Sequence, residues 1–197
     1  MSAPPDYNPQ PPRPAWGVRV PARKSLSTDE PILVAPAPAR ATLELTAWAG
    51  VPARPLVTQG QAVRAGEPVA APAADGGPWV HASTSGTVEA IGAFPVAGSD
   101  GPVPCIVIAA DGADTHWTGP APPPDPATLA PAALRAEIAR AGIIGLGGAR
   151  FPTADKLATG APALLLLIGG ECDPYLSCDD MLLRERAERV VAGGLVL

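Results

Sequence analysis

The chain has 197 residues, a net charge of −5 and a hydrophobic content of 47%, yet only 4% of its residues are aromatic. Since much of the apolar content is alanine, we expect small cores in one large or two small domains. The acidic balance and the lack of a basic cluster argue against a nucleic-acid partner.

The first residues lack the apolar stretch of a signal peptide, and the longest aliphatic run, residues 164–168, is far too short to cross a bilayer. We therefore expect a soluble, cytoplasmic protein that reaches a membrane only through partners. The three cysteines are Cys105, Cys172 and Cys178. Because they form no C-x-x-C motif, we expect buried thiols and no metal site.

Residues 1–15 are rich in proline and predict a disordered tail. Residues 16–118 alternate short apolar runs with turn residues, which is typical of an all-β sandwich or barrel. His81 and His116 are expected in turns or on the barrel surface, without a catalytic role. The predicted strands are 31–34, 41–45, 55–57, 68–70, 79–81, 86–91 and 105–108.

Residues 119–127 predict a stiff proline linker. A helix is predicted over 128–141, with Thr128 as its N-cap, Pro131 in its first turn and Gly142 at its end.

A second, short helix is predicted around Lys156, followed by a buried strand over 164–168. A last helix is expected to be capped by Asp179 or Asp180 and interrupted at 193–194. Within it, Arg184 and Glu188 are four residues apart, a spacing that predicts an ion pair.

The most informative segment is a glycine-rich loop followed by a lysine. Gly145, Gly147 and Gly148 allow close approach of a backbone to a ligand and can direct N–H groups at an anion. A helix beginning just after the loop would add its positive end, and Lys156 a full charge. The segment therefore predicts a phosphate-binding loop, with a plain helix–strand connection as the alternative.

Residues 59–70 and 83–91 resemble the two halves of the barrel-sandwich hybrid found in lipoyl and biotinyl carrier domains. A carrier needs an acceptor lysine on the hairpin before the second half. Residues 71–83 contain no lysine, so the sequence predicts the carrier fold without the carrier chemistry.

The run from Gly145 to Lys156 resembles the flavin-binding signature of NADH:quinone oxidoreductases. Residues 171–181 are similar to the RnfC component of the Rnf complex, a membrane-bound, ion-translocating electron-transport complex, as are 23–27, 50–57 and 81–88. The resemblance implies a mixed α+β chain: an all-β barrel-sandwich hybrid over 16–118, then a partial α/β FMN- and NADH-binding domain over 128–197.

Carried over by position, the resemblance implies that Gly145, Gly147 and Gly148 wrap FMN, with Lys156 near its phosphate or ring. It places Phe151 on the NADH adenine, Glu171 beside the flavin and Asp173 at the nicotinamide ribose. It implies electron input from NADH to FMN, other Rnf subunits as partners, and a peripheral position on the cytoplasmic side of the inner membrane. No catalytic residue is assigned.

Three departures from the family pattern suggest a second hypothesis. Arg150 stands where the family has glycine, and Ile168 where it has asparagine. The sequence also stops where the family's flavin domain is half built, before the 4Fe-4S ligands of the full-length family. The alternative is a truncated or split, non-catalytic paralogue that acts as a docking module, or whose flavin domain a separate chain completes.

Overall fold

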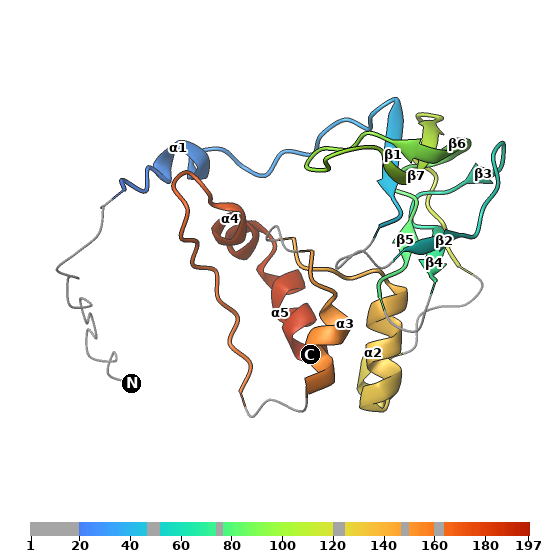
Figure 1. The fold of residues 1–197 in the computed structure, drawn as a ribbon. Helices are drawn as coiled ribbons and strands as arrows, with labels where there is room; N and C mark the ends of the chain where they lie inside the picture. Colours follow the sequence, from blue (N-terminus) through green and yellow to red (C-terminus); the bar gives the residue numbers. More distant parts are fainter. Residues whose placement is uncertain (1–19, 47–51, 74–76, 120–124, 147–149, 160–163) are drawn as a thin grey trace, which may run out of the picture. The chain divides into compact units, whose positions relative to one another are not determined.

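The computed structural model describes residues 20–46, 52–73, 77–119, 125–146, 150–159 and 164–197 (Figure 1). Its internal contacts divide the chain into two compact units. The first unit comprises residues 1–33 and 167–191, and the second comprises residues 34–166 and 192–197. The predicted proline-rich tail lies outside the described residues, as does most of the predicted linker.

The described strands all lie in the second unit and form two small antiparallel sheets (Figure 1). The first sheet has the order β1 (Arg40–Glu44), β7 (Val103–Ala110), β6 (Gly86–Phe94) and β3 (Ala62–Val63). The second has the order β2 (Ala53–Pro55), β4 (Pro68–Pro72) and β5 (Val80–His81).

One hydrophobic core draws its side chains from both sheets. Val69 on β4, Val88 on β6 and Ile106 on β7 have no exposed surface at all. At the start of β6, buried and exposed residues alternate, as the two faces of a strand require. Burying each of these aliphatic side chains contributes roughly 1.5–3 kcal/mol, so a few of them account for much of the stability of so small a core.

Most of the predicted strands are confirmed. The predictions over 41–45, 68–70, 79–81, 86–91 and 105–108 fall on β1, β4, β5, β6 and β7, whereas β2 begins two residues before the predicted 55–57. The strand predicted over 31–34 is wrong. That segment is irregular, with Leu33 and Val34 exposed, and the N–H of Ile32 donates to the Glu185 carboxylate instead of to a neighbouring strand.

The predicted first long helix is confirmed as α2 (Pro131–Arg140), with corrected ends. A 3-10 turn, η2 (Pro126–Thr128), occupies its predicted start, so Ala130 is the N-cap in place of Thr128. Gly142 ends the helix as predicted, because its φ of 70° lies in the left-handed region. A Cβ there would lie 2.6 Å from the carbonyl oxygen of Trp79, so glycine also allows α2 to pack beside β5.

The predicted short helix is α3 (Thr153–Lys156), followed by the 3-10 turn η3 (Leu157–Thr159). The buried strand predicted over 164–168 is wrong, because Leu164 is 71% exposed, Ile168 is 75% exposed, and the backbone is irregular. A strand needs a hydrogen-bonded neighbour, and the described part of the chain supplies none to this segment. Hydrophobicity alone therefore did not produce a strand here.

The last predicted helix is two helices, α4 (Cys178–Glu185) and α5 (Ala187–Val196). Ser177 is the N-cap of α4, and both candidate caps lie in the first turn, where acidic groups favour the positive helix end. Because α4 ends before Glu188, Arg184 pairs with Asp180 at 2.9 Å instead. The predicted interruption at 193–194 is also wrong, since α5 continues through both glycines. None of the described helices is long and apolar enough to cross a membrane.

Candidate functional site

The glycine loop is held closed at its base by backbone hydrogen bonds. Gly145 N–H donates to the carbonyl of Phe151 at 2.9 Å, and Thr153 N–H donates to the carbonyl of Ile143 at 3.0 Å. Ile144 and Pro152 form an antiparallel bridge between these two bonds. The two segments of this base thus fix both ends of the loop, while Gly147 and Gly148 lie outside the described residues.

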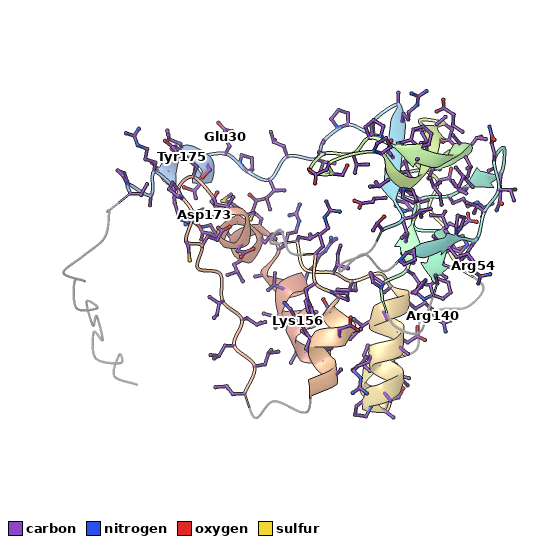
Figure 2. The ribbon with its side chains drawn as sticks, viewed as in Figure 1. Glu30, Arg54, Arg140, Lys156, Asp173 and Tyr175 are labelled. Carbon is purple, nitrogen blue, oxygen red and sulfur yellow. The ribbon has the colours of Figure 1, made fainter. Side chains whose placement is uncertain are left out.

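Two of the predicted site residues meet beside this base. The Lys156 ammonium lies over the Phe151 ring, 6.0 Å from its centroid, as a cation–π contact requires. Lys156 is exposed on α3 (Figure 2), so its charge is accessible to a ligand. The expected help from a helix end is small, because α3 has only four residues.

Arg150, at the far end of the loop, stands where the family has glycine, and its backbone adopts a conformation that favours glycine. Its φ of 50° lies in the left-handed region, which costs a non-glycine residue about 1–2 kcal/mol. Its guanidinium reaches Glu44 on β1, with 2.7 Å between Nη1 and Oε2. The loop is therefore anchored to the first sheet through a side chain that glycine could not supply.

In the first unit, Glu171 lies against the start of α4. Its Oε1 accepts a hydrogen bond from the Cys178 thiol at 2.9 Å, while Oε2 is buried and has no partner among the described residues. The thiol hydrogen bond is the main cause that lowers the pKa of Glu171, with smaller contributions from the backbone N–H groups of Asp179 and Asp180. The same bond raises the pKa of Cys178.

Glu171, Cys178 and Asp179 bring three ligand-type atoms within 4.8 Å of one another. In the structure these groups form a hydrogen-bonded cluster, in which the Cys178 thiol donates to Glu171. Cys105 is buried as predicted, but the prediction of buried thiols is wrong for Cys172 and Cys178, which are exposed. Cys172 lies in the irregular segment before α4 and Cys178 is the first residue of α4, and both side chains face solvent.

The predicted residues fall into two sets. Gly145, Phe151 and Lys156 belong to the second unit, whereas Glu171 and Asp173 belong to the first. Asp173 is exposed on the loop before α4 (Figure 2). The structure brings Phe151 and Lys156 into contact in the second unit, whereas Glu171 and Asp173 lie on one loop of the first unit.

A cleft of about 710 Å³ in the second unit was not predicted. Glu44, Trp79, His81, Gly142 and Arg150 are among the residues that line it. His81 is half-buried there, and burial lowers its pKa, so it is not the simple surface residue that was expected. A single histidine in a short strand gives no sequence signal for this cleft, since its other wall comes from the segment after α2, some 60 residues later.

The described residues fit a flavin nucleotide in two respects. The loop with a closed base has an exposed cation beside an aromatic ring at one end, which suits a phosphate and a planar ring. Oε2 of Glu171 is shielded and makes no hydrogen bond among the described residues, although the N–H groups of Asp179 and Asp180 nearby partly compensate its charge, so it is available to a ligand donor.

Comparisons with known proteins agree with the order of these segments. Residues 14–113 match the family described as the RnfC barrel sandwich hybrid domain, and residues 138–197 match the Nuo51 FMN-binding domain. The second match covers the glycine loop, α3, α4 and α5.

The chain is also similar to RnfC proteins, which are named as components of an ion-translocating oxidoreductase complex. It is 48% identical to that of Pseudomonas aeruginosa over 182 residues, which cover 90% of this chain and 23% of the relative. It is 39% identical to that of Rhodobacter capsulatus over 181 residues, which cover 90% of this chain and 35% of the relative. The chain therefore spans about a quarter to a third of the length of these relatives. With its N-terminal half matched by the RnfC domain and both halves matched in order by these relatives, the chain belongs to the RnfC family.

Proposed function

We propose that this chain contributes the FMN-binding entry point for electrons to an ion-translocating oxidoreductase complex, with NADH as the electron donor. The match of residues 138–197 to an FMN-binding domain carries the proposal. The closed base of the loop and the Lys156–Phe151 contact support it, because they place a cation and an aromatic face at the base where Gly145 is bonded to Phe151. The FMN-binding match favours this function over a purely docking role.

In this proposal the backbone of Gly145, Gly147 and Gly148 wraps the flavin nucleotide, and Lys156 neutralises its phosphate. Phe151 offers an apolar face for the NADH adenine. When bound, FMN would supply the chemistry, accepting two electrons from NADH and passing them on singly.

Glu171 and Asp173 complete the proposed assignment. Glu171 keeps an acceptor, Oε2, for an N–H donor of the flavin, and its lowered pKa keeps it charged at neutral pH. Asp173 is an exposed carboxylate that would accept hydrogen bonds from ribose hydroxyls.

The partners in this proposal are the other subunits of the complex, as the printed name of the relatives suggests. We further propose that the chain works at the cytoplasmic face of the inner membrane, held there by those subunits.

A flavin titration tests this proposal. The fluorescence of FMN is followed as the chain is added, for the unchanged chain, for Lys156→Met and for Arg54→Gln. Arg54 is a matched control, since it is exposed on β2 and its side chain makes no hydrogen bond or ion pair among the described residues (Figure 2). We expect Lys156→Met to weaken FMN binding roughly tenfold or more, because it removes a charge-assisted contact with the phosphate. We expect Arg54→Gln to leave FMN binding unchanged. Equal binding by all three chains would contradict the role of Lys156.

A further inference from the structure

Lys24 connects the two ends of the loop that carries Glu171 and Asp173. Its ammonium donates to the backbone carbonyl of Glu171 at 2.8 Å and to that of Leu176 at 2.7 Å. The two carbonyls are five positions apart, so a single side chain closes the loop as a clip. Hydrogen bonds from a charged donor are about twice as strong as neutral ones.

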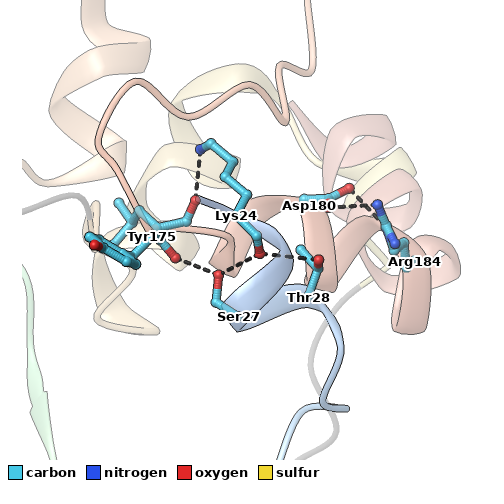
Figure 3. A network of polar contacts seen from close by, with 7 residues as sticks. Lys24, Ser27, Thr28, Tyr175, Asp180 and Arg184 are labelled. Carbon is cyan, nitrogen blue, oxygen red and sulfur yellow. Dashed lines mark hydrogen bonds and ion pairs between the residues drawn. The ribbon is translucent and has the colours of Figure 1, made fainter. Parts of the chain in front are cut away.

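The segment around Lys24 reinforces this clip with two further contacts, and Figure 3 shows the one made by Ser27. The Ser27 hydroxyl donates to the Tyr175 carbonyl at 2.5 Å, and Tyr175 N–H donates to the Ala22 carbonyl at 2.8 Å. The one-turn helix α1 (Ser25–Thr28) is stabilised in turn by Thr28, whose hydroxyl donates to the Lys24 carbonyl at 3.1 Å. Residues separated by about 150 positions in the sequence therefore form one local structure.

The clipped loop needs external support because its backbone is unfavourable. Tyr175 has a φ of 65°, in the left-handed region, which a residue with a bulky side chain rarely adopts. A conformation of this kind persists only where surrounding contacts impose it. The Lys24 bonds to the carbonyls around Tyr175 and the Ser27 bond to the Tyr175 carbonyl are such contacts.

The clip also determines where the Glu171 side chain lies. Glu171 is the first residue of the clipped loop, and Cys178, the first residue of α4, follows its end. The distance of 2.9 Å between the Glu171 carboxylate and the Cys178 sulfur requires the loop to stay folded back on α4. Opening the loop would separate these two groups.

We propose that Lys24 is a positioning residue, which clips the Glu171–Leu176 loop shut and thereby holds the Glu171 carboxylate against α4. Its consequence for cofactor binding rests on the proposed function, in which Glu171 and Asp173 contact FMN and NADH. The structural claim, that Lys24 holds the loop shut, does not rest on the proposed function, because the Glu171–Cys178 contact tests it without any cofactor.

The test uses the reactivity of Cys178 as a sensor of the loop. The thiol faces the carboxylates of Glu171 and Asp179, which raise its pKa and suppress its reactive thiolate. Rates of alkylation by iodoacetamide are measured at Cys178 across a range of pH, in the full chain and without added FMN. All chains carry Cys172→Ser to remove the other exposed thiol. Buried Cys105 reports unfolding of the second unit, and the helical circular dichroism signal reports loss of α4 in the first.

Four chains are compared: the parent, Lys24→Met, Glu171→Ala and Arg23→Gln. Glu171→Ala removes the carboxylate but keeps the backbone carbonyl that Lys24 binds. It therefore gives the alkylation rate of Cys178 when its contact with the Glu171 carboxylate is fully lost. Arg23→Gln removes a neighbouring exposed charge whose side chain makes no hydrogen bond or ion pair among the described residues. We expect Lys24→Met to react roughly three- to tenfold faster near neutral pH and to approach the profile of Glu171→Ala, while Arg23→Gln matches the parent.

A Lys24→Met profile that coincides with the parent while Glu171→Ala shifts would overturn the inference. So would an unshifted Glu171→Ala, because the Glu171–Cys178 contact would then be absent. If Cys105 becomes reactive in Lys24→Met, Ser27→Ala replaces it, since it removes only the bond to Tyr175. We then expect the alkylation profile of Ser27→Ala to shift less but in the same direction. A profile that does not shift would overturn the inference.

FMN binding is measured separately on the same chains. If the parent chain binds no FMN while the alkylation profiles shift, the proposed function fails and the clip stands. If the parent binds FMN and Lys24→Met binds it equally well despite a shifted profile, the clip does not serve the flavin site, and the functional part of the inference is overturned.

Discussion

The guanidinium of Arg150 lies 2.7 Å from the carboxylate of Glu44, although 106 residues separate them in the sequence. Arg150 ends the glycine loop, and Glu44 ends β1 in the first sheet. The arginine side chain is 55% exposed, so solvent screens the pair. The contact nevertheless joins the candidate nucleotide loop directly to the barrel-sandwich fold.

A double-mutant cycle with Glu44→Gln and Arg150→Met should give a coupling energy of about 0.2–1 kcal/mol, the range for exposed ion pairs. The coupling should shrink at high salt, because the charges are accessible to ions. Urea unfolding of the four chains at low and at high salt measures it. A coupling that salt leaves unchanged would mean that the pair is not the exposed contact described here.

Gly142→Ala should destabilise the chain by roughly 2–4 kcal/mol, since a Cβ there meets both a left-handed backbone and the Trp79 carbonyl at 2.6 Å. Gly60→Ala is the matched control. Gly60 also has a positive φ, of 85°, but a Cβ would meet nothing within 4 Å, so its cost should be about 1–2 kcal/mol. Equal losses in the two variants, measured by urea unfolding, would show that α2 does not pack against Trp79 as described.

Ile106→Ala should lower the free energy of unfolding by about 2–5 kcal/mol, because the side chain is fully buried in the core. Ile91 is its partner in the β6–β7 register and is 37% exposed. Ile91→Ala deletes the same atoms, yet it should cost clearly less, about 1 kcal/mol. Chemical denaturation of both variants compares a fully buried and a more exposed position of one cross-strand pair.

Asp111 should make the barrel-sandwich fold sensitive to acid. The hydroxyl of buried Ser85 donates to Oδ1 of Asp111 at 2.7 Å and is the main cause that lowers the pKa of this carboxylate. A lowered folded-state pKa contributes stability above the unfolded pKa, and this contribution is lost as the pH falls through the folded value.

Asp111→Asn should therefore be less stable than the parent near pH 7, with the difference shrinking below about pH 4. Urea midpoints at several pH values measure this. Asp100→Asn is the control, since Asp100 is exposed and makes no hydrogen bond among the described residues. A difference between Asp111→Asn and the parent that is constant with pH would contradict the charged role of Asp111.

The barrel-sandwich strands could be predicted because their pattern is local. Alternating buried residues in β6 and glycines in the turns are properties of a few consecutive positions. The strand predicted over 164–168 is absent from the structure, because a strand depends on a neighbour that no local pattern reveals. The same limit applies to Arg184, whose partner depended on where α4 ends.

The candidate site was predictable to a similar degree. The glycine loop and Lys156 could be predicted because they lie within twelve consecutive positions, and the structure places Lys156 beside Phe151. The bond between the Glu171 carboxylate and Cys178 was not predictable, because it depends on how the loop folds back on α4. Nor was the contact of Lys24, since no sequence pattern links residues about 150 positions apart.

The most direct test of the central claim is an absorbance spectrum of the purified chain after FMN has been added and the excess removed, followed by NADH in the absence of air. We predict that the chain retains FMN in a one-to-one ratio and that NADH bleaches the flavin band. Lys156→Met should retain much less flavin, whereas Arg54→Gln should match the parent. A chain that retains no flavin, or whose flavin NADH leaves oxidised, would contradict the assignment of this chain as an entry point for electrons.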